Sequence, residues 1–429
     1  AGNSVNGRQI SHSLGSVPGM ILIKNVTNAA IWDVWHNTFD ADDYMGFNSH
    51  NPKYETSGPW NNTLPTSEHF TVSSDMDVNR TGDDYVAYVF AHDDARFGTN
   101  GDQSIIKCGE YTGNGSYQTI DIGFEAQWVM IKNVDYARDW SIYDIMRGMP
   151  GGDQTTIGNS STRLRANTTS AEDSSGVGVA SNGFILANGS SEVNTLGESY
   201  IYIAIRRPHK PPTVGTDVFA IDTKTVASAN TPSYISNFPV DFAIRRNNIN
   251  SSDSTEFITR LTPGLLYYDT RADDSSWSTQ DYIKKAFQYN NGWGNVGGYD
   301  SNDYLWMFKR APGFMDVVAY IGSGASTRTV NHNLTVEPEM MVIKKRDGNS
   351  AWQVYHSSQG NTKYSPSFRT DPFYTSSDRW RDTTPTSTEF TLGSDSDVNG
   401  NGSEYIACLL YTSDAADEGL GVDLGGRRI

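Results

Sequence analysis

The amino-acid sequence predicts an all-β protein, built as a tandem array of four small β-sandwich modules of the jelly-roll or lectin-like type. The first observation is an internal repeat, because residues 20–36 (MILIKNVTNAAIWDVWH) match residues 340–356 (MMVIKKRDGNSAWQVYH) without a gap. The match continues at 65–79 and 385–399, so one structural unit occurs at least twice. The second observation is composition. Gly, Ser, Thr, Asn and Asp clusters separate short runs of β-branched and aromatic residues, as in strands joined by turns.

Two further copies of the repeat lie between these. The second copy contains WVMIKNVDYARDWSIYD at 128–144, and the third, degenerate copy contains VDFAIR at 240–245. The copies follow one another at intervals of roughly one small domain, ~100 residues. Solenoid repeats are shorter, at ~20–50 residues. We therefore expect separate modules arranged like beads on a string.

The register of the copies sets the boundaries of the expected modules. They span residues 1–95, 104–207, 214–310 and 314–407. The first copy begins after the strand that opens the others, so we expect a truncated N-terminus. Pro208, Pro211 and Pro212 cannot donate ladder hydrogen bonds, and they mark the linker between the second and third modules.

The second copy shows the strands of one module most clearly. Each strand is a short β-branched and aromatic run bounded by Gly, Asn, Asp or Ser, as in sandwiches. In chain order the expected strands are 104–113, 117–124, 127–134, 139–146, 183–188 and 199–205. Trp140 and Ile142 lie on one face of their strand, and Tyr143 and Ile145 lie on the other. Because both faces are apolar, we expect this strand to be central and Trp140 to be in the core.

The formal net charge of −17 predicts an acidic surface. Such a surface repels nucleic-acid phosphates and anionic lipids, so we expect neither nucleic-acid binding nor membrane insertion. No stretch approaches the ~20 apolar residues of a transmembrane helix. The two cysteines, Cys108 and Cys408, are too few for a disulfide scaffold or a zinc site of the Cys type.

An acidic motif recurs in the first and last copies. Asp75 and Asp77 in the first copy correspond to Asp395 and Asp397 in the last, and Val-Asn follows each pair. Alternating carboxylates suit Ca²⁺, but no Glu follows at the EF-hand spacing. The second copy keeps only the Val-Asn and the later Gly and Tyr. We favour a structural hairpin of strand, Asn/Gly turn and strand, with a Ca²⁺ site as the alternative and no other cofactor.

Two tryptophans in polar loops are the candidate ligand-binding residues. Trp60 and Trp380 occupy matching positions, each shortly before a shared Pro-Thr-Ser. An exposed indole can stack on a sugar ring, whereas a buried one would close an end of the sandwich, and we favour the end plug. The sequence shows no HExxH, CxxC or Ser-His-Asp arrangement and selects no pair of carboxylates. We therefore expect no enzymatic activity and assign no catalytic residue.

The longest motifs cover nearly all of residues 1–407. They include YTGNGS at 111–116, WVMIKN at 128–133, NGFILAN at 182–188, RAPGFMDVVAYIGSG at 310–324 and PTSTEFTLGSDSDVNGNGSEYIA at 385–407. With these motifs the chain resembles a module family of tailed-bacteriophage virion and tail-fibre-type proteins of uncharacterised function. The resemblance implies virion attachment, a β-rich fold, assembly into homotrimers and contacts with other virion proteins. Residues 408–429 instead resemble a translated sequencing adapter, so we expect this tail to be foreign and the chain to be a fragment.

These features together predict a non-enzymatic structural protein of a phage virion, located outside the cell. We expect a tail-fibre or receptor-binding type that engages a bacterial surface glycan or protein, because linked repeats multiply weak contacts. One alternative is a virion-borne or secreted glycan depolymerase. Another is a bacterial surface adhesin.

Overall fold

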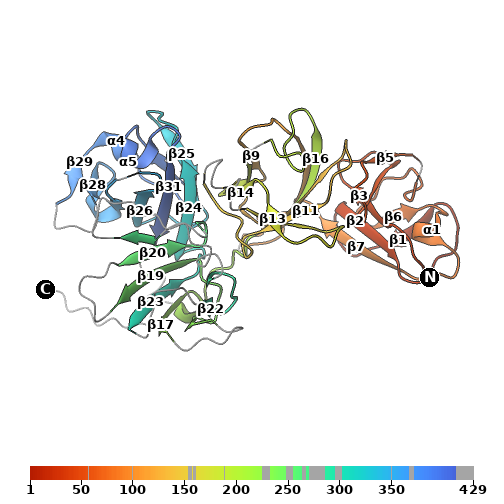
Figure 1. Ribbon diagram of the computed structural model, residues 1–429, viewed down its shortest axis with the longest axis horizontal. Coiled ribbons are helices and arrows are strands. Elements are labelled where there is room, and N and C mark those ends of the chain that lie inside the picture. The colour runs from red at the N-terminus through yellow and green to blue at the C-terminus, as the bar shows by residue number, and fades with distance from the viewer. Residues whose placement is uncertain are drawn as a thin grey trace. The chain divides into compact units, whose positions relative to one another are not determined.

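The computed structural model shows an all-β protein whose chain forms two compact units (Figure 1). Unit 1 comprises residues 1–144, 161–177 and 183–208, and unit 2 comprises residues 145–160, 178–182 and 209–429. The module expected at 104–207 therefore contributes segments to both units. The structure describes all residues except 57, 99, 153–156, 158–160, 188, 225–231, 248–254, 263–266, 270–285, 295–301, 349, 367–371 and 412–429. Among the described residues, no helix has the length and apolar character needed to cross a bilayer.

The second repeat shows the arrangement of strands in full. A six-stranded antiparallel sheet has the order β8-β16-β10-β11-β12-β13, and β9 pairs with β15 in a smaller sheet. The strands of the large sheet are β8 (Ile106–Thr112), β16 (Ser199–Arg206), β10 (Ala126–Asn133), β11 (Ser141–Asp144), β12 (Thr162–Arg165) and β13 (Asp173–Ser174). The smaller pair is β9 (Gln118–Asp121) and β15 (Gly183–Leu186). A further strand, β14 (Val177–Ala180), begins in unit 1 and continues into unit 2.

The first repeat has the same order without the opening strand, namely β7-β2-β3-β4-β5 with a β1-β6 pair. Its large sheet contains β7 (Tyr85–Ala91), β2 (Pro18–Asn25), β3 (Trp32–His36), β4 (Asp43–Gly46) and β5 (Tyr54–Glu55). The pair is β1 (Arg8–Ser11) and β6 (His69–Val72), and the one-turn helix α1 spans Met76–Asn79.

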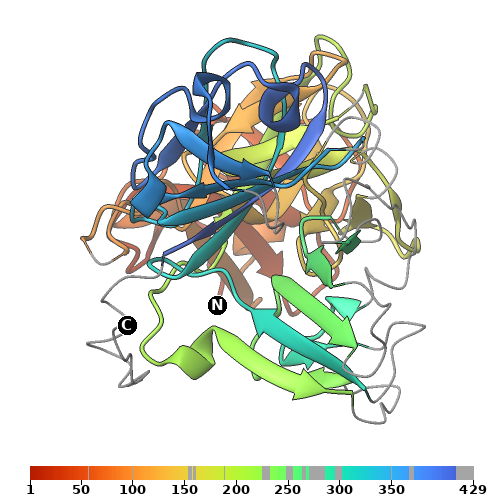
Figure 2. The ribbon, with the colours of Figure 1, turned by 90° about the vertical axis from the view of Figure 1, so that its left-hand side faces the viewer.

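The fourth repeat has the order β24-β31-β26-β27-β28-β29 with a β25-β30 pair, visible in blue in Figure 2. Its large sheet contains β24 (Met315–Ile321), β31 (Glu404–Leu410), β26 (Met340–Lys345), β27 (Gln353–His356), β28 (Lys363–Pro366) and β29 (Tyr374–Thr375). The pair is β25 (Arg328–Asn331) and β30 (Glu389–Leu392). The short helices are η2 (Ser357–Gln359), α4 (Ser377–Trp380) and α5 (Ser396–Asn399).

The third repeat, which is degenerate in sequence, keeps this topology. Its large sheet has the order β17-β23-β19-β20-β21, and β18 pairs with β22. The strands are β17 (Phe219–Thr223), β23 (Asp303–Phe308), β19 (Phe242–Asn247), β20 (Glu256–Thr259), β21 (Tyr267–Asp269), β18 (Tyr234–Ile235) and β22 (Gly292–Trp293), and the 3-10 helix η1 spans Gly215–Asp217. In this repeat, as in the second and fourth, the opening strand pairs with the closing one. All four repeats are therefore versions of one β-sandwich.

The end of the fourth repeat differs from the expected boundary at residue 407. Strand β31 continues through Cys408, Leu409 and Leu410, which pair with both β24 and β26. Cys408 and Leu409 are buried there, so they complete the sheet. The segment 408–429 is therefore not wholly outside the fold, and residues 412–429 lie beyond the described part of the chain.

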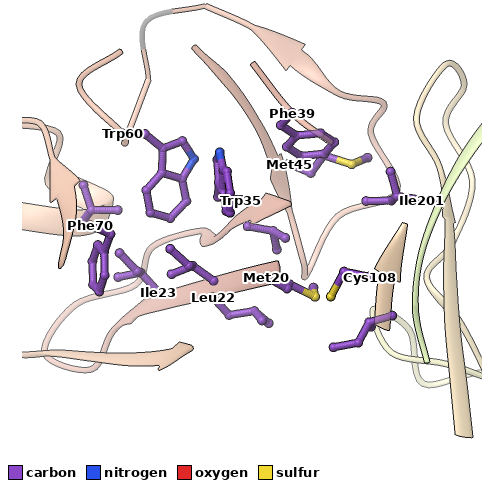
Figure 3. Packing of buried hydrophobic residues seen from close by; sticks show 14 of the residues in the cluster. Met20, Leu22, Ile23, Trp35, Phe39, Met45, Trp60, Phe70, Cys108 and Ile201 are labelled. Carbon is purple, nitrogen blue, oxygen red and sulfur yellow. The ribbon is translucent and has the colours of Figure 1, made fainter. Parts of the chain in front are cut away.

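The repeats of unit 1 do not have independent cores, in contrast to the expected beads on a string. One buried cluster joins Met20, Phe39 and Met45 of the first repeat to Cys108 and Ile201 of the second (Figure 3). The cluster also contains Met130 and Ile203 of the second large sheet, and Phe70 and Val72 of the small sheet of the first repeat. This arrangement explains why central strands such as β2 and β10 are apolar on both faces.

Trp140 lies at the centre of this contact between repeats. Its side chain is 2% exposed. The indole Nε1 donates to the Gly46 carbonyl oxygen at 3.0 Å, and the ring centroid lies 5.4 Å from that of Phe47. In unit 2 the equivalent Trp352 contacts Phe257 of the third repeat at 4.9 Å. The recurring tryptophan, which immediately precedes β11 and β27, is thus an anchor between neighbouring copies.

We predict that Trp140→Ala lowers the free energy of unfolding by about 3–5 kcal/mol, because it leaves a large cavity and removes the hydrogen bond to the Gly46 carbonyl. Urea unfolding followed by tryptophan fluorescence and circular dichroism measures this loss. The exposed Tyr136 provides a control, since Tyr136→Ala should change stability by less than about 0.5 kcal/mol. A loss below about 1 kcal/mol for Trp140→Ala would contradict the anchoring role.

Candidate functional site

The recurring acidic motif forms the start of a one-turn helix in the first and fourth repeats. Asp75 is the N-cap of α1 and accepts a hydrogen bond from the Asp77 amide at 2.8 Å. Asp395 caps α5 and accepts from the Asp397 amide at the same distance. The predicted strand-turn-strand hairpin is therefore wrong, because the carboxylates satisfy helix amides that a hairpin would not present. The role of the leading carboxylate is structural in both copies.

The Asn that ends the motif is buried in all three clear copies. In the fourth repeat the Asn399 amide donates to the carbonyl oxygens of Ala325 at 3.0 Å and Gly393 at 2.9 Å, and its Oδ1 accepts from the Ser323 amide at 2.8 Å. Asn79 and Asn194 make the corresponding bonds to residues 3–5 and 114–116. This side chain ties the opening loop of each copy to its closing segment.

The carboxylates of the fourth repeat are neutralised by an arginine. Arg379 of α4 forms ion pairs with Asp395 and Asp397, and its Nε donates to the Gln353 Oε1 at 2.9 Å. The Gln353 amide and the Ser350 hydroxyl complete the set by donating to Asp397. These ion pairs and hydrogen bonds give both Asp395 and Asp397 partners within the protein.

The first repeat lacks this compensation. In the shared register Pro59 replaces Arg379, and Asp33 replaces Gln353. Asp33 is 1% exposed, and its Oδ2 has no hydrogen-bond partner among the described residues. Burial and the charges of Asp77 and Asp75 raise its pKa well above the ordinary value of 3.8, against a smaller opposing effect of Lys24. The described residues contain no group of three or more His, Cys, Asp or Glu side chains arranged to hold a metal ion.

The two candidate tryptophans are inside the protein, so neither ring can stack on a ligand. Trp60 is 2% exposed and Trp380 is 0% exposed. Figure 3 shows Trp60 in the apolar cluster with Trp35 and Phe70. The Trp380 indole donates to the Lys363 carbonyl at 2.9 Å and packs edge-on against Tyr355. The ligand-binding assignment is therefore wrong, because both rings are buried in the core, and Trp380 is the last residue of helix α4.

An aromatic pair is exposed instead on the first repeat. Trp32, which corresponds to Trp140 and Trp352, stacks on Tyr88 with ring centroids 6.3 Å apart and an interplanar angle of 15°. Tyr88 is 47% exposed. The first repeat thus leaves the recurring tryptophan partly uncovered. We call Trp32 and Tyr88 the aromatic pair.

A cavity of about 350 Å³ lies at one end of the large sheet of the fourth repeat. We call it the repeat-4 cavity. Its lining is mainly polar and consists of Glu337, Pro338, Glu339, Tyr355, Ser357, Gly360, Asn361, Thr384 and Tyr411. These residues come from the segment before β26, from β27 and η2, and from loops after η2, after α4 and after β31. The volume is within the range of small-ligand sites, ~300–1,000 Å³.

The local geometry of the repeat-4 cavity is fixed by backbone structure. The Ser357 amide donates to the Glu339 carbonyl at 2.8 Å, which holds η2 against the start of β26. Gly360 ends η2 with a φ of 79°, a conformation that favours glycine. Next to it, the Asn361 amide donates to the Thr384 hydroxyl at 3.0 Å. Sequence reasoning missed these residues, although the acidic Glu337 and Glu339 stand where the first repeat has Val17 and Gly19.

Comparison with known proteins places most of the chain in one family. Residues 1–208 and 307–414 match the family described as Domain of unknown function (DUF7483). The unmatched stretch contains most of the degenerate third repeat, and the match at the other end continues past residue 407. No curated protein matches the chain.

We predict that Asn399→Ala destabilises the fourth repeat by about 1–3 kcal/mol, because it removes three hydrogen bonds and leaves the buried Gly393 carbonyl without this partner. The affected groups are the Ser323 amide and the Ala325 and Gly393 carbonyls. Thermal and urea unfolding measure the effect. Asn401→Ala, at an exposed position nearby, is the matched control. Equal stability of the two variants would show that the buried amide does not hold the loop.

We predict that Asp33→Asn removes a pH dependence of stability. Above the ordinary pKa of 3.8 the unfolded state loses the Asp33 proton while the native state keeps it, so the wild-type protein loses stability as pH rises toward the raised native pKa. The variant should match the wild type near pH ~3.8 and exceed it increasingly at higher pH. Urea unfolding across this range, with the exposed Asp42→Asn as control, tests the effect. A constant difference between Asp33→Asn and the wild type would contradict it.

Proposed function

We propose that this chain, which belongs to the family described as Domain of unknown function (DUF7483), is a non-enzymatic structural protein of a phage virion. In this proposal it is of tail-fibre or receptor-binding type, lies outside the cell, and attaches the particle to a bacterial surface glycan or protein. The observation that supports it most directly is the repeat-4 cavity, a polar pocket with tyrosines on an array of β-sandwiches.

Three features of the chain support a binding role. The repeats are rigidly built around buried clusters, so they can present a pocket without folding on contact. The net charge of −17 disfavours nucleic acid as the partner. Assembly into a homotrimer, which the phage resemblance implies together with contacts to other virion proteins, would present three copies of the pocket. Linked weak sites gain effective concentration, so the attachment of the whole particle can be strong.

A second candidate function is a glycan depolymerase, because the repeat-4 cavity contains two carboxylates, Glu337 and Glu339. Glycoside hydrolysis commonly uses two such groups, one as the acid and one as the base or nucleophile. Paired carboxylates also accept hydrogen bonds from sugar hydroxyls without any chemistry. We therefore rank binding first and treat hydrolysis as the alternative.

The proposal predicts saturable binding of the purified full chain to bacterial glycans without bond cleavage. An array of capsular and lipopolysaccharide glycans measures binding, and a reducing-end assay on each bound glycan measures hydrolysis. New reducing ends would favour the depolymerase. A folded chain that binds no glycan on the array and no bacterial cells would contradict the attachment role. Detection of the chain in purified virions, rather than on bacterial cells, separates a phage protein from a surface adhesin.

A further inference from the structure

The closing strand of the first repeat has an edge that no other strand covers. In the second, third and fourth repeats the closing strand lies between two neighbours, because the opening strands β8, β17 and β24 pair with it. In the first repeat β7 pairs with β2 alone and ends the sheet. The chain is contacted just before β7, where the Gly2 amide donates to the Asp83 carbonyl at 2.6 Å, and just after it, where the Asp93 amide donates to the Ile106 carbonyl at 2.9 Å. Between these contacts, β7 has a free edge in the described part of the chain.

The hydrogen-bond pattern of β7 shows which backbone groups face this edge. The Val26 amide donates to the Asp84 carbonyl at 2.9 Å, so the backbone of Asp84 bonds on the side of β2. Residues of an antiparallel strand bond alternately to one side and the other, so Val86 and Tyr88 also bond to β2. The residues between them direct their amides and carbonyls outward, and we call them the open edge: Tyr85, Ala87 and Val89. A row of unpaired backbone groups is a template for pairing with another strand.

The side chains of β7 are those of an interior strand. Tyr88 is 47% exposed, whereas the residues at the same place in the second and fourth repeats, Ile203 and Cys408, are 3% and 5% exposed. Ala87 is exposed, whereas the equivalent Ala407 is buried. The sequence of β7, YVAYVFA, contains none of the charged residues or prolines that protect natural edge strands from pairing. The first repeat therefore has a strand suited to the middle of a sheet at the margin of one.

The other repeats show which side chains a strand needs at this place. In the fourth repeat Tyr320 of the opening strand stacks on Tyr405 of the closing strand, with ring centroids 5.2 Å apart, and its hydroxyl donates to the Val398 carbonyl at 2.8 Å. Tyr111 makes the corresponding contacts in the second repeat. Three positions before this tyrosine, the buried Val317 lies opposite the residue equivalent to Tyr88. An opening strand therefore contributes an apolar residue and, three positions later, a tyrosine.

The first repeat keeps the surface that receives such a strand. Tyr85 stands where Tyr405 supports the stacked ring, and Val78 stands where Val398 accepts from the phenol. Tyr85 is half-buried, whereas Tyr405 is 0% exposed beneath its partner. The Tyr85 hydroxyl accepts from the Arg80 amide at 2.7 Å, as the Tyr405 hydroxyl does from the Gly400 amide. The ring is thus already held in the orientation that a second tyrosine would stack on.

We infer that the open edge of β7 is a docking site for an extended strand of another polypeptide. The strand pairs antiparallel with β7 and carries a tyrosine opposite Tyr85 and an apolar residue opposite Tyr88. Backbone hydrogen bonds to the open edge supply affinity, and these two side chains supply selectivity, as in other cases of strand addition to a sheet. The occupant follows from the opening strands that fill this place in the other three repeats. The inference concerns a protein partner and does not depend on glycan binding in the repeat-4 cavity.

A synthetic peptide with the sequence of residues 314–320, FMDVVAY, is the probe for the full chain. It ends at the tyrosine because Gly2 already bonds to the chain just before β7. Fluorescence anisotropy of the labelled peptide should show saturable binding. In residue-resolved hydrogen exchange, the peptide should slow the amides of the open edge by at least about tenfold and change those of Val86 and Tyr88 little, since these already bond to β2. Replacing the peptide tyrosine (Tyr320→Ala) should weaken binding by about tenfold.

Two variants of the chain test the position of the site. Ala87→Pro removes one outward amide and no bond to β2, so it should fold and bind the peptide at least about tenfold more weakly. Ala87→Ser keeps the amide and is the matched control, with a change of less than about threefold. The tethered-strand variant, in which residues 314–320 are joined before Ala1, should cover the open edge, bind no peptide and unfold at a higher temperature.

Three results would overturn the inference. The first is a folded wild-type chain that binds no peptide and gains no protection at the open edge. The second is a tethered-strand variant, or a folded Ala87→Pro variant, that binds the peptide as tightly as the wild type. The third is a dimer in sedimentation whose open-edge amides are protected without peptide, because the occupant is then a second copy of the chain. If Ala87→Pro does not fold, the tethered-strand variant and the Tyr320→Ala peptide decide.

Discussion

The fold of the first, second and fourth copies depends on one buried asparagine, which is Asn79, Asn194 or Asn399. Its amide hydrogen-bonds to backbone groups in the opening loop, 74–80 residues away in the sequence. Without this side chain the backbone groups of that loop would lose their partner inside the protein, at a cost of ~1 kcal/mol for each hydrogen bond. The asparagine therefore joins the start of each sandwich to its end.

Close backbone contact supports this junction at the same place in these three copies. A Cβ atom added at Gly2, Gly113 or Gly322 would lie 2.1 Å from a carbonyl oxygen just after the asparagine. A tyrosine at the start of the closing strand also supports the junction in these three copies. In the fourth repeat its hydroxyl, that of Tyr405, accepts a hydrogen bond from the Gly400 amide at 2.7 Å. Glycine, asparagine and tyrosine thus form one structural motif. This explains why Val-Asn, Gly and Tyr persist in the second copy while the aspartates do not.

The sequence was sufficient for the strand content and for the repeat, because both depend on local patterns and on direct comparison of copies. The strand order of the third repeat shows that the topology persists where those patterns are weak. The one-turn helices after Asp75 and Asp395 were missed although their N-cap bonds are local, because Val-Asn followed by Gly favoured an Asn/Gly turn over a helix start. The burial of Trp60 and Trp380 could not be predicted either, because polar neighbours in the sequence give no indication of the direction in which an indole side chain points.

The repeat-4 cavity was the least predictable feature. It consists of single departures from the first repeat, such as Glu339 for Gly19, and each departure alone resembles ordinary surface variation. Only the structure shows that they line one space. Comparing the copies position by position does reveal these departures. Their meaning becomes clear only once the close contact of Gly19 with His92 and Cys108 is known.

The shared cluster between the first two repeats has an evolutionary consequence. A sheet that buries side chains against a neighbouring copy, as the end of β4 does where Gly46 accepts from Trp140, is not a self-sufficient building block. Duplication of the first repeat alone would therefore leave an apolar face exposed to water, which promotes aggregation.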